Sequence, residues 1–321
     1  MRVTGFQPHL STTSWPRKTY RIMCGVAFFI GFILALRVVF YDPKFPENQK
    51  DFTQKWQQCR KKEKDSKFLE LKKFAVIIPV TFKDEKILFD FLNLWKNFLP
   101  DSEMQSKIIT DLIFYYQGNF EDNRGSPVKL QIENWMKSNS EIKEMFDTIY
   151  YLNAKFENPK SDTILNNRMF YNLLTDADLK IRYRYFFFMN PKVHPIRKDW
   201  LLKLHDSSIF SSESFWQKAS NLKDFSQKPK DTSFLKTYSP GIYSFSPCFL
   251  SFAREIMHSN LRTDFTNAFL QYILSPQNSY KTQYLISQFK MSNLIWITES
   301  TVYNFDIQED FDDVYFTYSL N

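Results

Sequence analysis

Four basic side chains close behind an apolar segment are the residues best suited to chemistry in this chain. The segment Arg182–Met189 reads "RYRYFFFM", and Lys192, His194, Arg197 and Lys198 follow it. Lys and Arg bind phosphoryl oxygens through charge-assisted hydrogen bonds. If the segment is a strand, these cations follow its carboxyl end, where α/β sheets bind ligands. The alternative is a surface turn whose cations are merely solvated.

Carboxylates and histidines elsewhere have competing explanations. Asp264, in "RTDFTNAF", could act as a general base or could cap the helix that follows it. Asp176 and Asp178 form a D-x-D pattern, but they precede the apolar segment, so we expect them to cap a helix. His194, His205 and His258 lack metal-ligand spacing, so the alternative for each is a surface or packed residue. Gly-rich phosphate loops and a G-x-S-x-G elbow are absent. The acidic run Gln308–Phe316 is typical of a solvated tail, although it could reach a site.

The distribution of charge argues against a nucleic-acid partner. The net charge is +7, and residues 1–41 contribute five basic side chains and no acidic one, which leaves +2 for residues 42–321. Residues 22–41 read "IMCGVAFFIGFILALRVVFY", a length that suits a membrane span of about 20 residues. Basic residues precede this segment, so we expect residues 1–21 to be cytosolic. A cleaved signal peptide is the main alternative, and a buried soluble helix is a third.

Behind the expected span, the sequence predicts a stem and one folded domain. Residues 42–73 are dense in charged side chains, including "RKKEKDSK", and such runs are usually solvated. Residues 74–321 then form the expected domain. This topology would place Cys59 and Cys248 in an oxidising lumen, where a single disulfide could form. We favour a plain buried thiol for Cys248.

The domain alternates between strand and helix patterns. "FAVIIPVTF" (74–82) and "DLIFYYQG" (111–118) are typical of buried strands, and the helical pattern "DEKILFDFLNLWKNFL" (84–99) lies between them. Residues 127–154 predict helices leading into another strand, and residues 163–179 predict a helix before Arg182–Met189. This alternation predicts a parallel three-layer α/β sheet. The turns at 79–83, 117–122 and 190–197 should therefore lie at the ligand-binding edge.

Four segments, in order, resemble the GT-A type of nucleotide-diphospho-sugar transferase. They are "VIIPVTFKDE" (76–85), "KSDTILNNRMFYNLL" (160–174), "FFFMNPKVHPIRKDWLLKL" (186–204) and "YSPGIYSFSPCFLSFAREI" (238–256). In relatives the third often reads like "EPDxxPxRxxWL". The resemblance covers roughly residues 74–303. It implies a GT-A fold, a nucleotide-sugar donor and a glycan or protein acceptor, with the domain in the lumen of the Golgi or endoplasmic reticulum behind a single-pass type II anchor.

Residue by residue, the resemblance implies a donor site and a base. Asp264 would be the catalytic base. The implied donor-binding residues are Pro79, Val80, Thr81, Asn166, Asn190, Lys192, His194 and Arg197. Where relatives carry acids that hold a divalent ion, this chain has Asn190 and Lys192. We therefore expect no metal ligand here and transfer without a cofactor, unless other acids hold Mn²⁺ or Mg²⁺. The competing interpretation is a noncatalytic scaffold that keeps the fold and binds glycan or protein.

Overall fold

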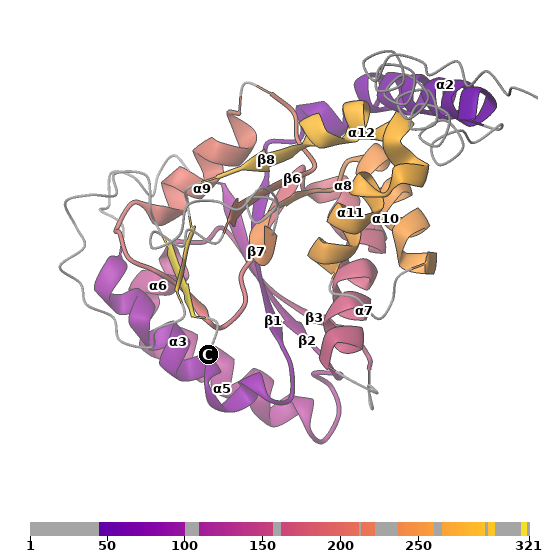
Figure 1. The fold of residues 1–321 in the computed structure, drawn as a ribbon. Coiled ribbons are helices and arrows are strands. Elements are labelled where there is room, and N and C mark those ends of the chain that lie inside the picture. The colour runs from indigo at the N-terminus through magenta and orange to yellow at the C-terminus, as the bar shows by residue number, and fades with distance from the viewer. Residues whose placement is uncertain are drawn as a thin grey trace, which may run out of the picture. The chain divides into compact units, whose positions relative to one another are not determined.

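A seven-stranded sheet, in the order β3-β2-β1-β4-β7-β6-β8, forms the centre of the structure (Figure 1). The computed structural model describes residues 45–99, 109–156, 162–211, 213–221, 237–259, 265–292, 295–298 and 316–319. The strands of this sheet are β1 (Phe74–Val80), β2 (Thr110–Tyr116), β3 (Ile149–Asn153), β4 (Tyr185–Phe188), β6 (Gln217–Asn221), β7 (Thr237–Ser244) and β8 (Phe289–Met291).

The sheet is mostly parallel, as expected for the GT-A fold that the resemblance implied, but two of its strand pairings are antiparallel. Strands β3, β2, β1 and β4 are parallel to one another, but β7 is antiparallel to β4 and β6 is antiparallel to β7. The strand–helix alternation that predicts parallel pairing extends only from β1 to β4. A second sheet, in the order β5-β10-β9, was not predicted. Its strands are β5 (Val193–Pro195), β9 (Ile295–Thr298) and β10 (Phe316–Ser319).

Helices cover both faces of the main sheet, so the predicted three-layer α/β fold is confirmed (Figure 1). Alternate residues of β1 face opposite cores: Val76 and Ile78 lie in one, Ala75 and Ile77 in the other. The first core is completed by α3 (Leu88–Leu94), α5 (Gly125–Ser138), α6 (Ser140–Glu144) and α9 (Trp200–Ile209). The second core contains residues of α7 (Asp162–Thr175), α8 (Ala177–Arg182), α10 (Pro247–Ser259), α11 (Phe265–Leu274) and α12 (Ser279–Leu285).

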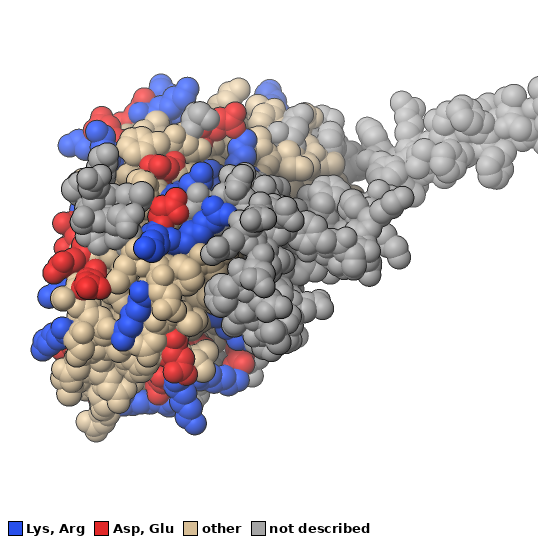
Figure 2. Space-filling view, turned by 90° about the vertical axis from the view of Figure 1, so that its left-hand side faces the viewer, with Lys and Arg blue, Asp and Glu red and all other residues tan. Residues whose placement is uncertain are grey.

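Charge is mixed on the face of the molecule seen in Figure 2, where Lys and Arg lie among Asp and Glu. This pattern accords with a net charge of only +2 over residues 42–321. Among the helices that the structure describes, none combines the length and apolar composition needed to cross a bilayer. The expected cytosolic tail, 1–21, and membrane span, 22–41, lie outside the described residues.

The segment expected to be a solvated stem contains α2 (Phe45–Asp65), and part of this helix packs against the second core. Phe52, Trp56 and Cys59 contact that core, and the ring centroids of Trp56 and Trp216 are 5.4 Å apart. The charge run is indeed mostly exposed, but Glu63 is buried. This burial is compensated because Arg60 donates to the Glu63 carboxylate over 2.5 Å.

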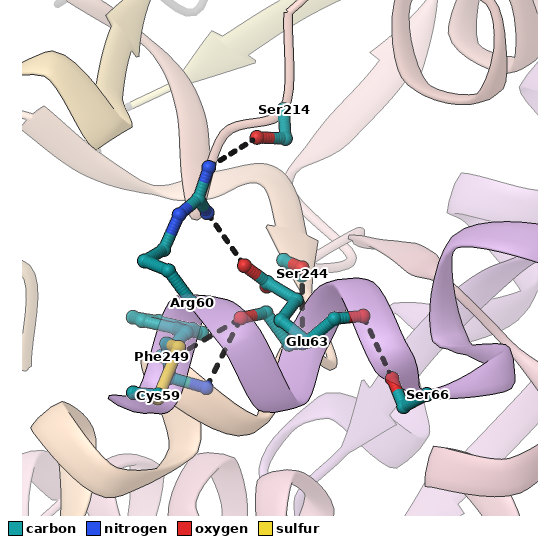
Figure 3. The surroundings of a disulfide bond; sticks show 9 residues. Cys59, Arg60, Glu63, Ser66, Ser214, Ser244 and Phe249 are labelled. Atoms are coloured by element: carbon teal, nitrogen blue, oxygen red, sulfur yellow. Dashed lines mark hydrogen bonds and ion pairs between the residues drawn. A yellow bond between two sulfur atoms is a disulfide. The ribbon is translucent and has the colours of Figure 1, made fainter. Parts of the chain in front are cut away.

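A disulfide joins Cys59 of α2 to Cys248 of α10 (Figure 3). The expectation of a plain buried thiol at Cys248 is therefore wrong. The turn before α10 fixes Cys248 in place, because the Ser246 hydroxyl accepts hydrogen bonds from the backbone N–H groups of Cys248 and Phe249. This is ordinary helix capping by a serine. Two packed helices thus present the two sulfur atoms to each other, across 189 residues of chain.

Candidate functional site

The carboxyl ends of β1, β2 and β4 meet at one edge of the main sheet, as the sequence predicted. The three strands are parallel neighbours, and Val80 of β1 pairs with Tyr116 of β2. Beyond the last pair of β1 and β4, the Met189 N–H donates to the Ile77 carbonyl over 2.9 Å. The turns that follow these strands therefore leave the sheet together. In an α/β sheet such an edge is where ligands bind.

Hydrogen bonds between Thr81 and Asp84 stabilise the turn after β1. The Asp84 carboxylate accepts hydrogen bonds from the Thr81 N–H, at 3.1 Å, and from the Thr81 hydroxyl, at 2.6 Å. Asp84 thus closes this turn, and within the helical pattern of residues 84–99 the helix α3 begins only at Leu88. Pro79 and Val80, two of the predicted donor-binding residues, are buried strand residues beneath the turn.

Gln117 links three of the turns at this edge, and sequence reasoning gave it no role. Its side chain is buried and accepts from the Phe82 N–H over 3.0 Å while donating to the Phe156 carbonyl over 3.2 Å. Its backbone N–H donates to the Val80 carbonyl. One glutamine therefore ties together the turns after β1, β2 and β3. A lone polar residue after a strand has no sequence signature that would distinguish it.

The turn after β4 is closed by hydrogen bonds to Asn190. The side-chain oxygen of Asn190 accepts a hydrogen bond from the Lys192 N–H at 2.9 Å, and the Asn190 carbonyl accepts from the Val193 N–H. Both oxygens of Asn190 thus stabilise the conformation of this turn. Within the described part of the chain, no three His, Cys, Asp or Glu side chains are grouped to hold a metal ion.

The predicted basic cluster is divided by the fold. His194 lies in β5, opposite Thr317 of β10, and is only 3% exposed. Burial lowers the pKa of His194 to about 4, so its ring is neutral at neutral pH. The expected cationic role of His194 is therefore unsupported. Lys192 and Arg197 are both half-buried, Lys192 before β5 and Arg197 after it.

Of two further predicted site residues, the structure describes Asn166 but not Asp264. Asn166 lies on α7 and is exposed, whereas its neighbour Asn167 is buried. Asp264 lies outside the described residues, so its role as a base stays a prediction. By contrast, Asp176 caps α8 by accepting from the Leu179 N–H over 2.9 Å, as predicted.

A polar and aromatic group beside the turn after β1 was also missed. The Arg124 guanidinium lies 3.5 Å from the centroid of the Phe82 ring and 3.4 Å from Glu85. Tyr116 donates its hydroxyl proton to Glu85 over 2.7 Å, and burial together with this bond raises the pKa of Tyr116. These side chains therefore contact one another beside the turn after β1. Arg124 is distant in sequence from the turn it covers, which is why no local pattern indicated it.

Comparison with solved structures finds glycosyltransferases, the kind of protein whose segments the sequence resembles. A glycosyltransferase involved in the glycosylation of the major capsid of PBCV-1 has 8% identity and a TM-score of 0.43, covering 77% of this chain and 93% of its own. The galactosyltransferase LgtC, in complex with donor and acceptor sugar analogs, has 7% identity and a TM-score of 0.44, covering 77% and 87%. Mouse xyloside xylosyltransferase 1, in its apo form, has 9% identity and a TM-score of 0.42, covering 70% and 87%.

No family model and no curated protein matches the sequence. At such low identities and TM-scores, the activity of this chain has to be argued from its own residues.

Proposed function

We propose that this protein is a glycosyltransferase that moves a sugar from a nucleotide-sugar donor to a glycan or protein acceptor. The observation that carries the proposal is the shared edge of β1, β2 and β4. Two of the four segments that resemble GT-A transferases, 76–85 and 186–204, contain the carboxyl ends of β1 and β4, which lie at this edge. The turn after β1 would receive the nucleotide, and the turn after β4 would receive the diphosphate.

The proposed transfer needs no metal ion. The departing nucleoside diphosphate gains negative charge, and Lys192 and Arg197 would stabilise that charge in place of a divalent ion. Asp264 would take the proton of the acceptor hydroxyl. Nucleotide binding should then be insensitive to EDTA and should weaken as salt rises. A requirement for Mn²⁺ would mean that other acids hold a metal, and this part of the proposal would fail.

We also propose that the domain lies in the lumen of the Golgi or endoplasmic reticulum, anchored by residues 22–41. The disulfide between Cys59 and Cys248 supports an oxidising compartment, because such bonds rarely persist in the cytosol. Protease treatment of sealed microsomes tests the topology. A C-terminal tag should resist digestion until detergent is added, and digestion without detergent would contradict it.

The function itself is tested by binding and turnover. The purified full chain should gain thermal stability with a UDP- or GDP-sugar, and should release the nucleoside diphosphate when a suitable acceptor is added. Stabilisation by a ligand that binds only the folded state grows with its concentration over Kd. The transferase function is excluded if none of these donors stabilises the chain and none of them is hydrolysed.

The second candidate, a noncatalytic scaffold that binds glycan or protein, is favoured by one specific observation. His194, expected among the donor-binding cations, is buried and uncharged, which leaves fewer groups for a diphosphate. A scaffold should bind immobilised glycans without any nucleotide. Its glycan affinity should also be unchanged by Lys192→Ala, because the turn after β4 would have no role in binding the glycan.

A further inference from the structure

Lys83 has an exposed side chain on a firmly held backbone at the proposed donor edge. It lies in the turn after β1, whose N–H groups at Thr81 and Phe82 donate to Asp84 and Gln117. Its own side chain is 76% exposed, and its ammonium group lies 2.6 Å from the Asp162 carboxylate. Because the backbone of this turn is held in place and the Lys83 side chain is exposed, the ammonium group can change partners without disturbing the fold.

The charge of the Asp162 carboxylate is stabilised even without Lys83. It is the first residue of α7, where the positive end of the helix dipole favours a carboxylate. Its side chain is 63% exposed, so water can solvate the charge if Lys83 leaves. An exposed ion pair of this kind shifts a folding equilibrium by at most about fivefold. The pair therefore offers little resistance to being opened.

We propose that Lys83 is a phosphate-binding residue of the donor site, and that Asp162 competes with the donor diphosphate for it. This inference rests on the proposed function. A diphosphate carries more negative charge than one carboxylate and accepts several charge-assisted hydrogen bonds, so the ammonium gains by the exchange. Lys83 would then be a third cation of the donor site beside Lys192 and Arg197, and it follows β1 as Lys192 follows β4.

The proposal predicts that the two halves of the ion pair affect binding in opposite directions. Lys83→Gln should weaken binding of the nucleoside diphosphate about tenfold or more, because a hydrogen bond to a charged group is lost. Asp162→Asn should strengthen it by up to about fivefold, because the competing carboxylate is gone. Lys83→Arg keeps the charge and should bind nearly as the wild type does. A pair that only stabilises the start of α7 predicts no such opposition.

The experiment is calorimetric titration of the full chain with UDP, GDP, CDP and inorganic pyrophosphate. The pair Lys290–Glu213, at 2.5 Å and with side chains 36% and 68% exposed, provides the control, since Lys290→Gln and Glu213→Gln should leave affinity unchanged. Opposite effects of Lys83→Gln and Asp162→Asn support the proposal. Effects of the same sign, or none, on a wild type that binds would overturn it while leaving the proposed function intact. A wild type that binds none of the nucleotides would overturn the proposed function itself, and this inference with it.

Discussion

Replacing Gln117 with Met should destabilise the folded protein far more than the same change at a second buried glutamine. Methionine keeps the length of the side chain but cannot hydrogen-bond like an amide. The Phe82 N–H and the Phe156 carbonyl would each lose their partner. An unsatisfied buried polar group costs about 1–3 kcal/mol. Both bonds are only partly buried, so each loss should fall in the lower part of that range, and the two together should remove about 2–4 kcal/mol from the free energy of unfolding.

Gln217 is the matched control. It is as buried as Gln117, but among the described residues its side chain makes one hydrogen bond, of 3.3 Å to the Tyr243 hydroxyl. Its side-chain oxygen has no hydrogen-bond partner among the described residues. Gln217→Met therefore removes one weak bond and one unsatisfied polar atom, and should cost about 1 kcal/mol or less. Urea unfolding followed by far-UV circular dichroism measures both variants. Equal losses, or a neutral Gln117→Met, would refute the reasoning that this side chain joins the three turns.

Three further predictions concern other parts of the molecule. Cys248→Ser should remove about 5 kcal/mol of stability, since the disulfide closes a 189-residue loop, and dithiothreitol should lower the melting temperature of the wild type but not of the variant. His194 is neutral when folded but protonates in the unfolded chain, so stability should fall by roughly 3 kcal/mol as pH drops from about 6.5 to about 4; His194→Gln should flatten this slope in acid-unfolding curves. Lys192→Ala and Arg197→Ala should each lower turnover on the order of 10²-fold with little change in melting temperature, and unchanged turnover would remove them from the site.

The features that could be predicted from the sequence are those that depend on residues close together in the chain. The run Phe74–Val80 is wholly apolar and forms a strand buried on both faces, and Asp176 caps the helix that follows it. The disulfide, the burial of Glu63 and the neutral state of His194 could not be predicted in this way. Each depends on a partner or neighbour brought close only by the tertiary fold. The short strands of the second sheet have three or four residues each, too few to show a period.

The disulfide also constrains the order in which the protein can be completed during synthesis. Cys59 is made 189 residues before Cys248, which at about 5–20 residues per second is an interval of roughly 10–40 s. Through that interval α2 has neither its covalent partner nor the rings of Tyr280 and Tyr284 that Phe52 contacts in the finished structure. The first helix of the described chain is therefore among the last to be fixed. Until then its apolar stripe and its thiol are open to chaperones and oxidoreductases, so any chain truncated before α10 would expose both.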